Sequence, residues 1–192
     1  MKNPTNGEEK VKKAINIVLA ALMVFVIGAC GGEKTVTIGN QIWMAKNLND
    51  ASKGGKCYED KPENCEKYGR LYTWEEATKA CPSGWHLPNN AEWEALVSSA
   101  GGMDAAGGKL KAKSGWEKGG GGSDEHGFSA LPGGYGIPDG SFANVGNYGN
   151  WWSATEYSTD YAYTWLMYYN SSRVFKSYYD KSYLLSVRCV KD

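Results

Sequence analysis

The chain has 192 residues, and its 21 basic side chains equal its 21 acidic side chains in number. This length fits one domain with a sizeable hydrophobic core once an N-terminal segment is set aside. Because the balanced composition offers no basic patch, we expect no nucleic-acid partner.

The first 30 residues have the pattern of a bacterial lipoprotein signal. Three lysines precede an uncharged run at 14–29, which is short for a membrane span and has the size of a secretory h-region. Small residues stand directly before Cys30. This pattern resembles the lipobox of bacterial lipoproteins, in which the signal is cut before the cysteine and the cysteine receives lipid. We therefore predict a signal peptide at 1–29, lipid on Cys30 as the link to the membrane, and a tether at 30–35. An ordinary signal peptide and an uncleaved anchor are the alternatives.

The remaining cysteines agree with export. Of the five cysteines, four remain when Cys30 is set aside, and an even number in an exported chain predicts disulfides. These four allow three pairings. A bond between Cys57 and Cys65 would close a short loop and leave Cys81 to pair with Cys189. A zinc site is the weaker alternative, because the chain has no CxxC and only two histidines.

The segment 35–45 predicts a β-hairpin, because two β-rich runs flank Gly39 and Asn40, a pair suited to a tight turn. The segment 46–69 is rich in charges and turn residues, and we expect an irregular loop there.

After this loop the sequence predicts two short helices. The first, at 73–81, has Thr73 as N-cap and Glu76 three residues later, which forms a capping box. The second begins after Asn89, with Glu92 in the equivalent position. Its apolar stripe consists of Trp93, Leu96 and Val97.

The second half of the chain changes from glycine-rich to strand-rich. Residues 113–150 combine glycine with aromatic, Asn and Asp residues, and predict a long ordered loop region with a mobile glycine run at 119–122. The expected strands are 151–155, 161–169, 173–178 and 183–190. Helices followed by an antiparallel sheet indicate an α+β domain.

Five segments in order resemble the Fibrobacter succinogenes major paralogous domain: VTIGNQIWMAKNLN, GRLYTWEEATKACPSGWHLPNNAEWEAL, FSALPGGY, WWSATE and SVRCVKD. The resemblance covers 36–192, which we therefore expect to be a single domain. Members of that family are typically secreted or lipid-anchored, and the family has no established activity.

The helix pair is also similar to a segment of formylglycine-generating, sulfatase-modifying enzymes, which have a C-type lectin-like fold. In that fold a cysteine at the end of the first helix bonds to one in the final strand, which implies a bond between Cys81 and Cys189. Those enzymes use a reactive cysteine pair with copper, whereas disulfides account for the cysteines here. The calcium-binding motifs of lectins are absent apart from IPDG at 137–140, so we expect neither a metal nor another cofactor.

The two histidines carry little functional signal. We expect His86, between the helices, to be packed and hydrogen-bonded. His126 follows Asp124 and Glu125, a group that suits a solvated turn better than a metal site. Neither residue is expected to be catalytic.

The aromatic residues of the glycine-rich region are the remaining signal. Tyr and Trp beside Asn and Asp are typical of recognition surfaces, so we expect a non-catalytic module that binds a polysaccharide or a surface protein. It would be displayed on the envelope of a Gram-negative bacterium, at the outer membrane or cell surface. A sulfatase-modifying enzyme and a purely structural envelope protein are the alternatives. The candidate contacts are Tyr135, Asp139, Phe142, Asn144, Asn147, Tyr148, Asn150 and Trp151. Because neighbours on a strand face opposite sides, Trp152 is expected in the core.

Overall fold

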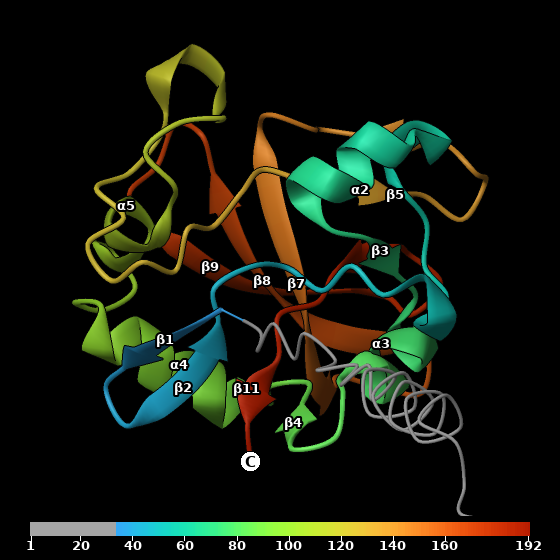
Figure 1. Cartoon of the computed structure of the whole chain (residues 1–192), viewed down its shortest axis with the longest axis horizontal. Helices are drawn as coiled ribbons and strands as arrows, with labels where there is room; N and C mark the ends of the chain where they lie inside the picture. Colours follow the sequence, from blue (N-terminus) through green and yellow to red (C-terminus); the bar gives the residue numbers. More distant parts are fainter. Residues whose placement is uncertain (1–33) are drawn as a thin grey trace, which may run out of the picture. The chain divides into compact units, whose positions relative to one another are not determined.

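The computed structural model describes residues 34–192 and is built around a five-stranded sheet (Figure 1). In this sheet β10 runs parallel to β7, and the other neighbours are antiparallel. The strands in spatial order are β3 (Leu71–Tyr72), β10 (Leu185–Ser186), β7 (Tyr148–Glu156), β8 (Tyr161–Tyr168) and β9 (Val174–Asp180). The expected signal peptide at 1–29 and the lipid on Cys30 lie outside the described residues.

A second sheet contains the N-terminal hairpin. Its strands in spatial order are β1 (Thr35–Ile38), β2 (Gln41–Met44), β11 (Val190–Lys191) and β4 (Trp85–His86). The hairpin is confirmed, and its turn places Gly39 in the left-handed region with a φ of 59°. A separate ribbon pairs β5 (Tyr135–Gly136) with β6 (Phe142–Ala143) inside the glycine-rich region.

The described chain has four α-helices, so the expectation of two is wrong. They are α2 (Pro62–Tyr68), α3 (Trp74–Ala80), α4 (Asn90–Ser99) and α5 (Ala106–Leu110), with 3-10 turns at Ala51–Lys53, Tyr58–Asp60 and Glu117–Gly119. The two expected helices are confirmed as α3 and α4, and both capping boxes are formed, Thr73 with Glu76 and Asn89 with Glu92.

The two additional helices have different origins. Helix α2 begins at Pro62, a residue suited to the first helical turn, and lies in the segment expected to be irregular. Helix α5 contains two glycines, which are poor helix formers. A Cβ on Gly107 would come within 2.5 Å of the Arg173 carbonyl oxygen, so glycine allows α5 to pack against that backbone.

The expected last strand, 183–190, is also divided. Its first part is β10 in the five-stranded sheet, and its end joins the other sheet as β11. The single small antiparallel sheet of the sequence interpretation is therefore replaced by two sheets and a ribbon. Between β10 and β11 the buried residues Val187, Arg188 and Cys189 carry the chain from one sheet to the other.

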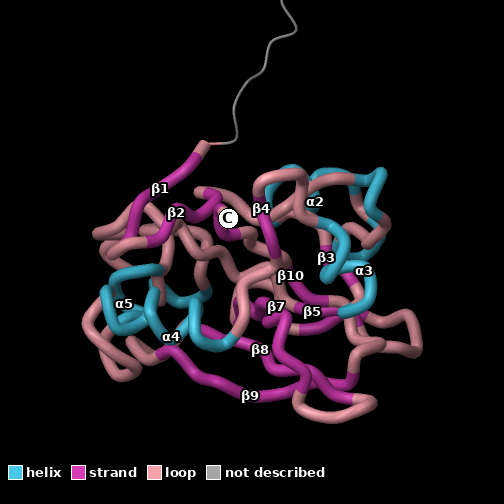
Figure 2. The backbone as a smooth tube through the Cα atoms, turned by 90° about the horizontal axis from the view of Figure 1, so that it is seen from below, coloured by secondary structure: helices cyan, strands magenta, loops and turns pink. Residues whose placement is uncertain are grey.

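Hydrophobic clusters cover both faces of the five-stranded sheet. Trp151 belongs to the cluster that includes α4 and α5, and Trp152 belongs to the cluster that includes α3. Figure 2 shows α4 and α5 at one end of the molecule and α2 with α3 at the other. The strand alternation thus sends adjacent tryptophans into separate cores, and the expectation that Trp152 is core is confirmed.

The buried cation of Arg188 links the segment between the two sheets to the N-terminal hairpin and to the glycine-rich region. The side chain of Arg188 is fully buried, and it donates to Asn47 Oδ1 from Nε at 3.0 Å and from Nη2 at 2.6 Å. It also donates to the carbonyls of Met44 and Phe128. Burial lowers the pKa of Arg188 to about 9, and the nearby Asp124 carboxylate opposes that shift. The guanidinium therefore stays charged at neutral pH.

Asn47 connects this cation to three further elements. Its Oδ1 also accepts from Trp151 Nε1 at 2.9 Å, and its Nδ2 donates to the Tyr68 carbonyl at 2.8 Å and to Ser186 Oγ at 3.4 Å. One amide thus links β7, β10 and the end of α2 to Arg188, and both of its polar atoms have partners.

Within the glycine run at 119–122, which was expected to be mobile, Gly120, Gly121 and Gly122 pack closely against other backbone segments, whereas Gly119 is exposed and has no such contact. A Cβ on Gly120 would lie 1.9 Å from the Tyr169 carbonyl oxygen, so only glycine fits. The buried Lys111 ammonium donates to the carbonyls of Gly120 at 2.6 Å, Tyr168 at 3.0 Å and Ser171 at 2.9 Å. Burial lowers the pKa of Lys111.

Replacing Asn47 by Leu is expected to reduce the free energy of unfolding by at least about 3 kcal/mol, because a buried cation loses its principal acceptor. Urea denaturation of the two proteins measures the change. The control is Asn49→Leu, the same substitution at an exposed neighbour, which should shift stability by less than about 0.5 kcal/mol. Equal effects of the two substitutions would contradict the role of Asn47.

For Thr164 we predict that removing a buried polar group does not lower stability. Its hydroxyl is fully buried and has no hydrogen-bond partner among the described residues. Thr164→Val should therefore leave thermal stability unchanged or raise it, since the methyl group removes an unpaired hydroxyl. In the matched control, Thr155→Val removes the acceptor of the Asn90 N–H at 3.0 Å and should cost about 1 kcal/mol. Calorimetry tests both, and a clear loss of stability in Thr164→Val would refute this reading.

Candidate functional site

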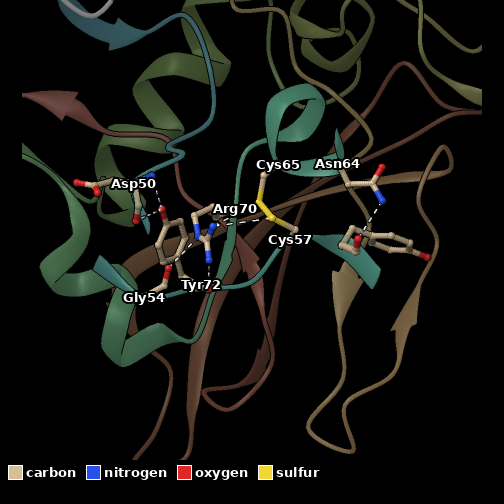
Figure 3. The surroundings of a disulfide bond; sticks show 9 residues. Asp50, Gly54, Cys57, Asn64, Cys65, Arg70 and Tyr72 are labelled. Carbon is tan, nitrogen blue, oxygen red and sulfur yellow. Dashed lines mark hydrogen bonds between the residues drawn. A yellow bond between two sulfur atoms is a disulfide. The ribbon is translucent and has the colours of Figure 1, made fainter. Parts of the chain in front are cut away.

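The disulfides agree with the pairing considered from the sequence. Cys57 bonds to Cys65, and Cys81 at the end of α3 bonds to Cys189. Figure 3 shows the first bond beside Arg70, whose Nη1 lies 3.8 Å from the sulfur of Cys57 and 3.7 Å from that of Cys65. All four described cysteines are bonded, so residues 34–192 offer no free thiol for chemistry of the sulfatase-modifying type.

Arg70 fixes this disulfide loop to the chain before it. Its Nε donates to the Gly54 carbonyl at 2.9 Å, and its Nη2 donates to the Gly55 carbonyl at 2.7 Å. Close by in Figure 3, the Tyr72 hydroxyl donates to the Asp50 carbonyl at 3.2 Å. The irregular segment is therefore ordered by side chains that bind backbone carbonyls.

Two of the candidate contact residues are inaccessible, which corrects the sequence interpretation. Trp151 has no exposed surface, and its ring packs beside that of Trp93 from α4, with centroids 6.3 Å apart. Asn150 is also fully buried, and its amide has no partner among the described residues. A pattern of neighbouring residues could not show that a helix and a loop cover this part of β7.

Tyr135, Asn144 and Tyr148 are brought together but are largely used in packing. All three are half-buried. Asn144 Nδ2 donates to the Tyr135 hydroxyl at 3.0 Å, and the Tyr148 ring lies 4.6 Å from that of Tyr168 between centroids. Tyr135 also packs on Tyr179, and burial raises the pKa of Tyr179 to about 12. Because these rings pack against one another, little of their surface is left for a ligand to contact.

The other three candidates lie in different settings. Phe142 packs on the Tyr58 ring, with centroids 5.2 Å apart, and Asn147 is half-buried. Asp139 is exposed, and the hydroxyl and N–H of Ser141 donate to its carboxylate at 2.6 and 2.9 Å, which lowers the pKa of Asp139. Its carboxylate thus holds a turn together.

The most exposed aromatic surface lies elsewhere, at the turn between β7 and β8 and on β9. We define the tyrosine patch as Tyr157, Tyr161, Tyr163 and Tyr178, of which the first, second and fourth are 49%, 40% and 47% exposed. Tyr157 and Tyr178 stack with centroids 4.0 Å apart and ring planes 4° from parallel. Tyr163 meets Tyr157 edge-on at 5.3 Å, and Tyr161 meets Tyr178 edge-on at 5.8 Å.

Sequence reasoning did not select the tyrosine patch as a candidate site. The available signal was the run 161–169, which is apolar on both faces, so one face needs a cover or a partner. In the structure the end of this run nearest Tyr161 is exposed, and Lys176 on β9 places its Nζ 5.0 Å from the Tyr163 ring centroid. The patch thus combines aromatic rings with a cation.

A separate hollow of about 520 Å³ lies between the start of β1, the end of α2 and the loop before β5. We call it the lysine groove, because Lys34, Lys46 and Lys67 line it and are all exposed. Its remaining lining is mixed, with buried Asn47 and Tyr68 and the acidic residues Glu66 and Asp124 among its members.

His86 is hydrogen-bonded, as expected, but its side chain is 40% exposed and therefore only partly packed. Its Nδ1 lies 2.7 Å from Asp192 Oδ1 and its Nε2 lies 2.7 Å from Glu92 Oε1. Burial lowers the pKa of His86, but the hydrogen bonds and charges of the two carboxylates outweigh it and raise the pKa above its ordinary value. Across residues 34–192, no cluster of three or more His, Cys, Asp or Glu residues is arranged to hold a metal, and His126 lies in none.

The fold and these surfaces define a disulfide-bonded α+β domain with an exposed aromatic patch. A family model, that of the Fibrobacter succinogenes major domain, matches residues 36–191, and the chain belongs to this family. No curated protein and no solved structure matches the chain. Within residues 34–192, no helix has the length and apolar character needed to cross a membrane.

The carboxylates around His86 predict a pH-dependent contribution to stability. Because the folded pKa is raised, this contribution is complete below the ordinary pKa of about 6.5 and disappears as pH rises through the folded value. The wild type should therefore exceed His86→Gln in stability at pH 5.5 by more than at pH 8.5. Solvent screens these half-exposed groups, so the difference should stay below about 1 kcal/mol. Urea denaturation at both pH values measures it, and a pH-independent difference would argue against the ion pairs.

Proposed function

We propose that the protein is an exported, lipid-anchored, non-catalytic binding module that recognises a polysaccharide through the tyrosine patch. The lipobox-like sequence before Cys30 supports a lipid anchor in the envelope of a Gram-negative bacterium, at the outer membrane or cell surface. The two disulfides support an oxidising compartment.

The tyrosine patch is the observation that carries this proposal. Sugar rings present apolar C–H faces that pack on aromatic rings, while their hydroxyls bind polar groups such as the phenolic hydroxyl. The Tyr157 and Tyr178 rings are about half exposed and are held by mutual stacking on a sheet edge. A rigid aromatic surface loses little conformational entropy when it binds.

We further propose that the domain has a C-type lectin-like fold. The bond between Cys81 and Cys189 supports this, because it joins the end of α3 to the residue before β11, the last strand. The α+β arrangement, with a long glycine-rich region between α5 and β7, agrees with the same fold.

A surface protein is the second candidate ligand. Exposed tyrosines are also common in protein interfaces, where charged groups surround the aromatic centre. Here Lys176, beside the patch, pairs with Glu94 at 2.8 Å, and Lys181 pairs with Glu156 at 3.3 Å. These ion pairs would form a polar rim suited to a protein partner.

The test is a glycan array probed with the full chain in detergent, followed by titration of the polysaccharides that bind. The double variant Tyr157→Ala, Tyr178→Ala should weaken binding at least tenfold, since it removes the stacked rings. Met103→Ala is the matched control, because Met103 is 38% exposed and lies outside the patch, and it should bind as the wild type does.

Each outcome bears on the proposal. A wild type that binds no glycan would overturn the polysaccharide proposal, and capture of a surface protein that the double variant loses would favour the second candidate. If the double variant binds glycans as tightly as the wild type does, the patch is not the site. Circular dichroism of both variants establishes that they are folded.

A further inference from the structure

The lysine groove presents three ammonium groups on one surface. Lys34, Lys46 and Lys67 are exposed, and none of them forms an ion pair within 4.0 Å with another residue of the described chain. Lys67 is held over the ring of Tyr68, with its Nζ 4.7 Å from the centroid. These cations are therefore available to an external partner.

The acidic residues of the groove do not cancel this charge. Asp124 accepts hydrogen bonds from the Ser129 N–H at 2.7 Å and the Ser129 hydroxyl at 2.6 Å, and its charge acts on the buried Arg188. Only Glu66 remains as an exposed anion of the lining. The groove is therefore positive at its opening, although the chain as a whole has equal numbers of acidic and basic residues.

Covalent geometry places this groove close to the proposed anchor. Lys34 follows Cys30 by four residues, and four residues span at most about 14 Å when fully extended. Electrostatic attraction in physiological salt acts over about 8 Å. A lipid on Cys30 would thus hold the groove within or next to the headgroup layer.

We propose that the lysine groove docks on the phosphate groups of anionic lipids in the membrane that holds the Cys30 lipid. This inference rests on the proposed lipid anchor and is independent of the polysaccharide ligand. The anchor supplies attachment, and the groove fixes which face of the domain meets the membrane. Attraction of this kind strengthens membrane contact about fivefold for each lysine at the surface.

The test uses the protein purified from bacterial cells that express the full sequence. It is mixed with vesicles, its flotation with them in a density gradient is recorded, and acetylation of each lysine is measured by mass spectrometry. One sample uses neutral phosphatidylcholine vesicles, and a second contains about 30% phosphatidylglycerol, whose anionic headgroups give the vesicle surface a negative potential. The three groove lysines should label at least threefold more slowly on the anionic vesicles. Lys79 on α3, whose side chain is 72% exposed, is the internal control and should label equally on both.

Salt and charge reversal test the cause of the protection. At about 0.5 M NaCl the protection should largely disappear, because salt screens attraction between exposed charges. The double variant Lys46→Glu, Lys67→Glu should remove the protection of Lys34 as well, whereas Lys79→Glu should leave it intact. Both variants change exposed side chains, and circular dichroism verifies their folding.

The outcomes separate this inference from the anchor on which it rests. If the protein does not rise with neutral vesicles in a density gradient, the lipid anchor and the docking are both overturned. Flotation with equal labelling on both vesicles would overturn the docking alone. If 10 mM inorganic phosphate with neutral vesicles protects the three lysines equally well, the groove is an anion pocket and the membrane assignment is wrong.

Discussion

The hydrogen bonds of the Arg188 guanidinium are the interaction on which the two sheets depend. A buried charge is tolerated only when its donors are satisfied, because desolvation otherwise costs several kcal/mol. Its partners are Asn47, the Met44 carbonyl at the end of β2 and the Phe128 carbonyl of the glycine-rich region. Its own segment connects β10 to β11. Arg188 therefore has its full set of partners only when the hairpin, the loop and both sheets are in place.

Lys111 is a second buried cation that binds backbone carbonyls, in this case those in and around the glycine-rich region. That region has little regular secondary structure, so its backbone carbonyls need other partners. Lys111 collects several of them, and the adjacent glycines let the backbones approach closely enough to do so. Two buried cations thus bind backbone carbonyls of segments that have little regular secondary structure.

The exposed aromatic residues differ from those expected from the sequence, because exposure depends on what covers a strand. Trp151 lies inside β7 and Tyr157 directly follows the end of that strand, and both are aromatic residues near polar neighbours. Trp151 packs against Trp93 of α4 and is fully buried, whereas Tyr157 stacks on Tyr178 at the sheet edge and stays half exposed. Helix α4, which begins about 60 residues before Trp151 in the sequence, covers Trp151 but not Tyr157. The residues next to Trp151 in the sequence give no sign of this cover.

The sequence by itself determined the features that neighbouring residues control. These are the family, the capped starts of α3 and α4, the Gly39 turn, the main strands and the opposite directions of Trp151 and Trp152. Only the tertiary structure decided between the possible cysteine pairings, divided the last strand between two sheets and formed α5 against the backbone at Arg173. It alone assembled the lysine groove and, at a separate place, the tyrosine patch. The physical reason is that caps, turns and alternation act within a few residues, whereas burial, pairing and surface shape arise from contacts between segments far apart in the chain.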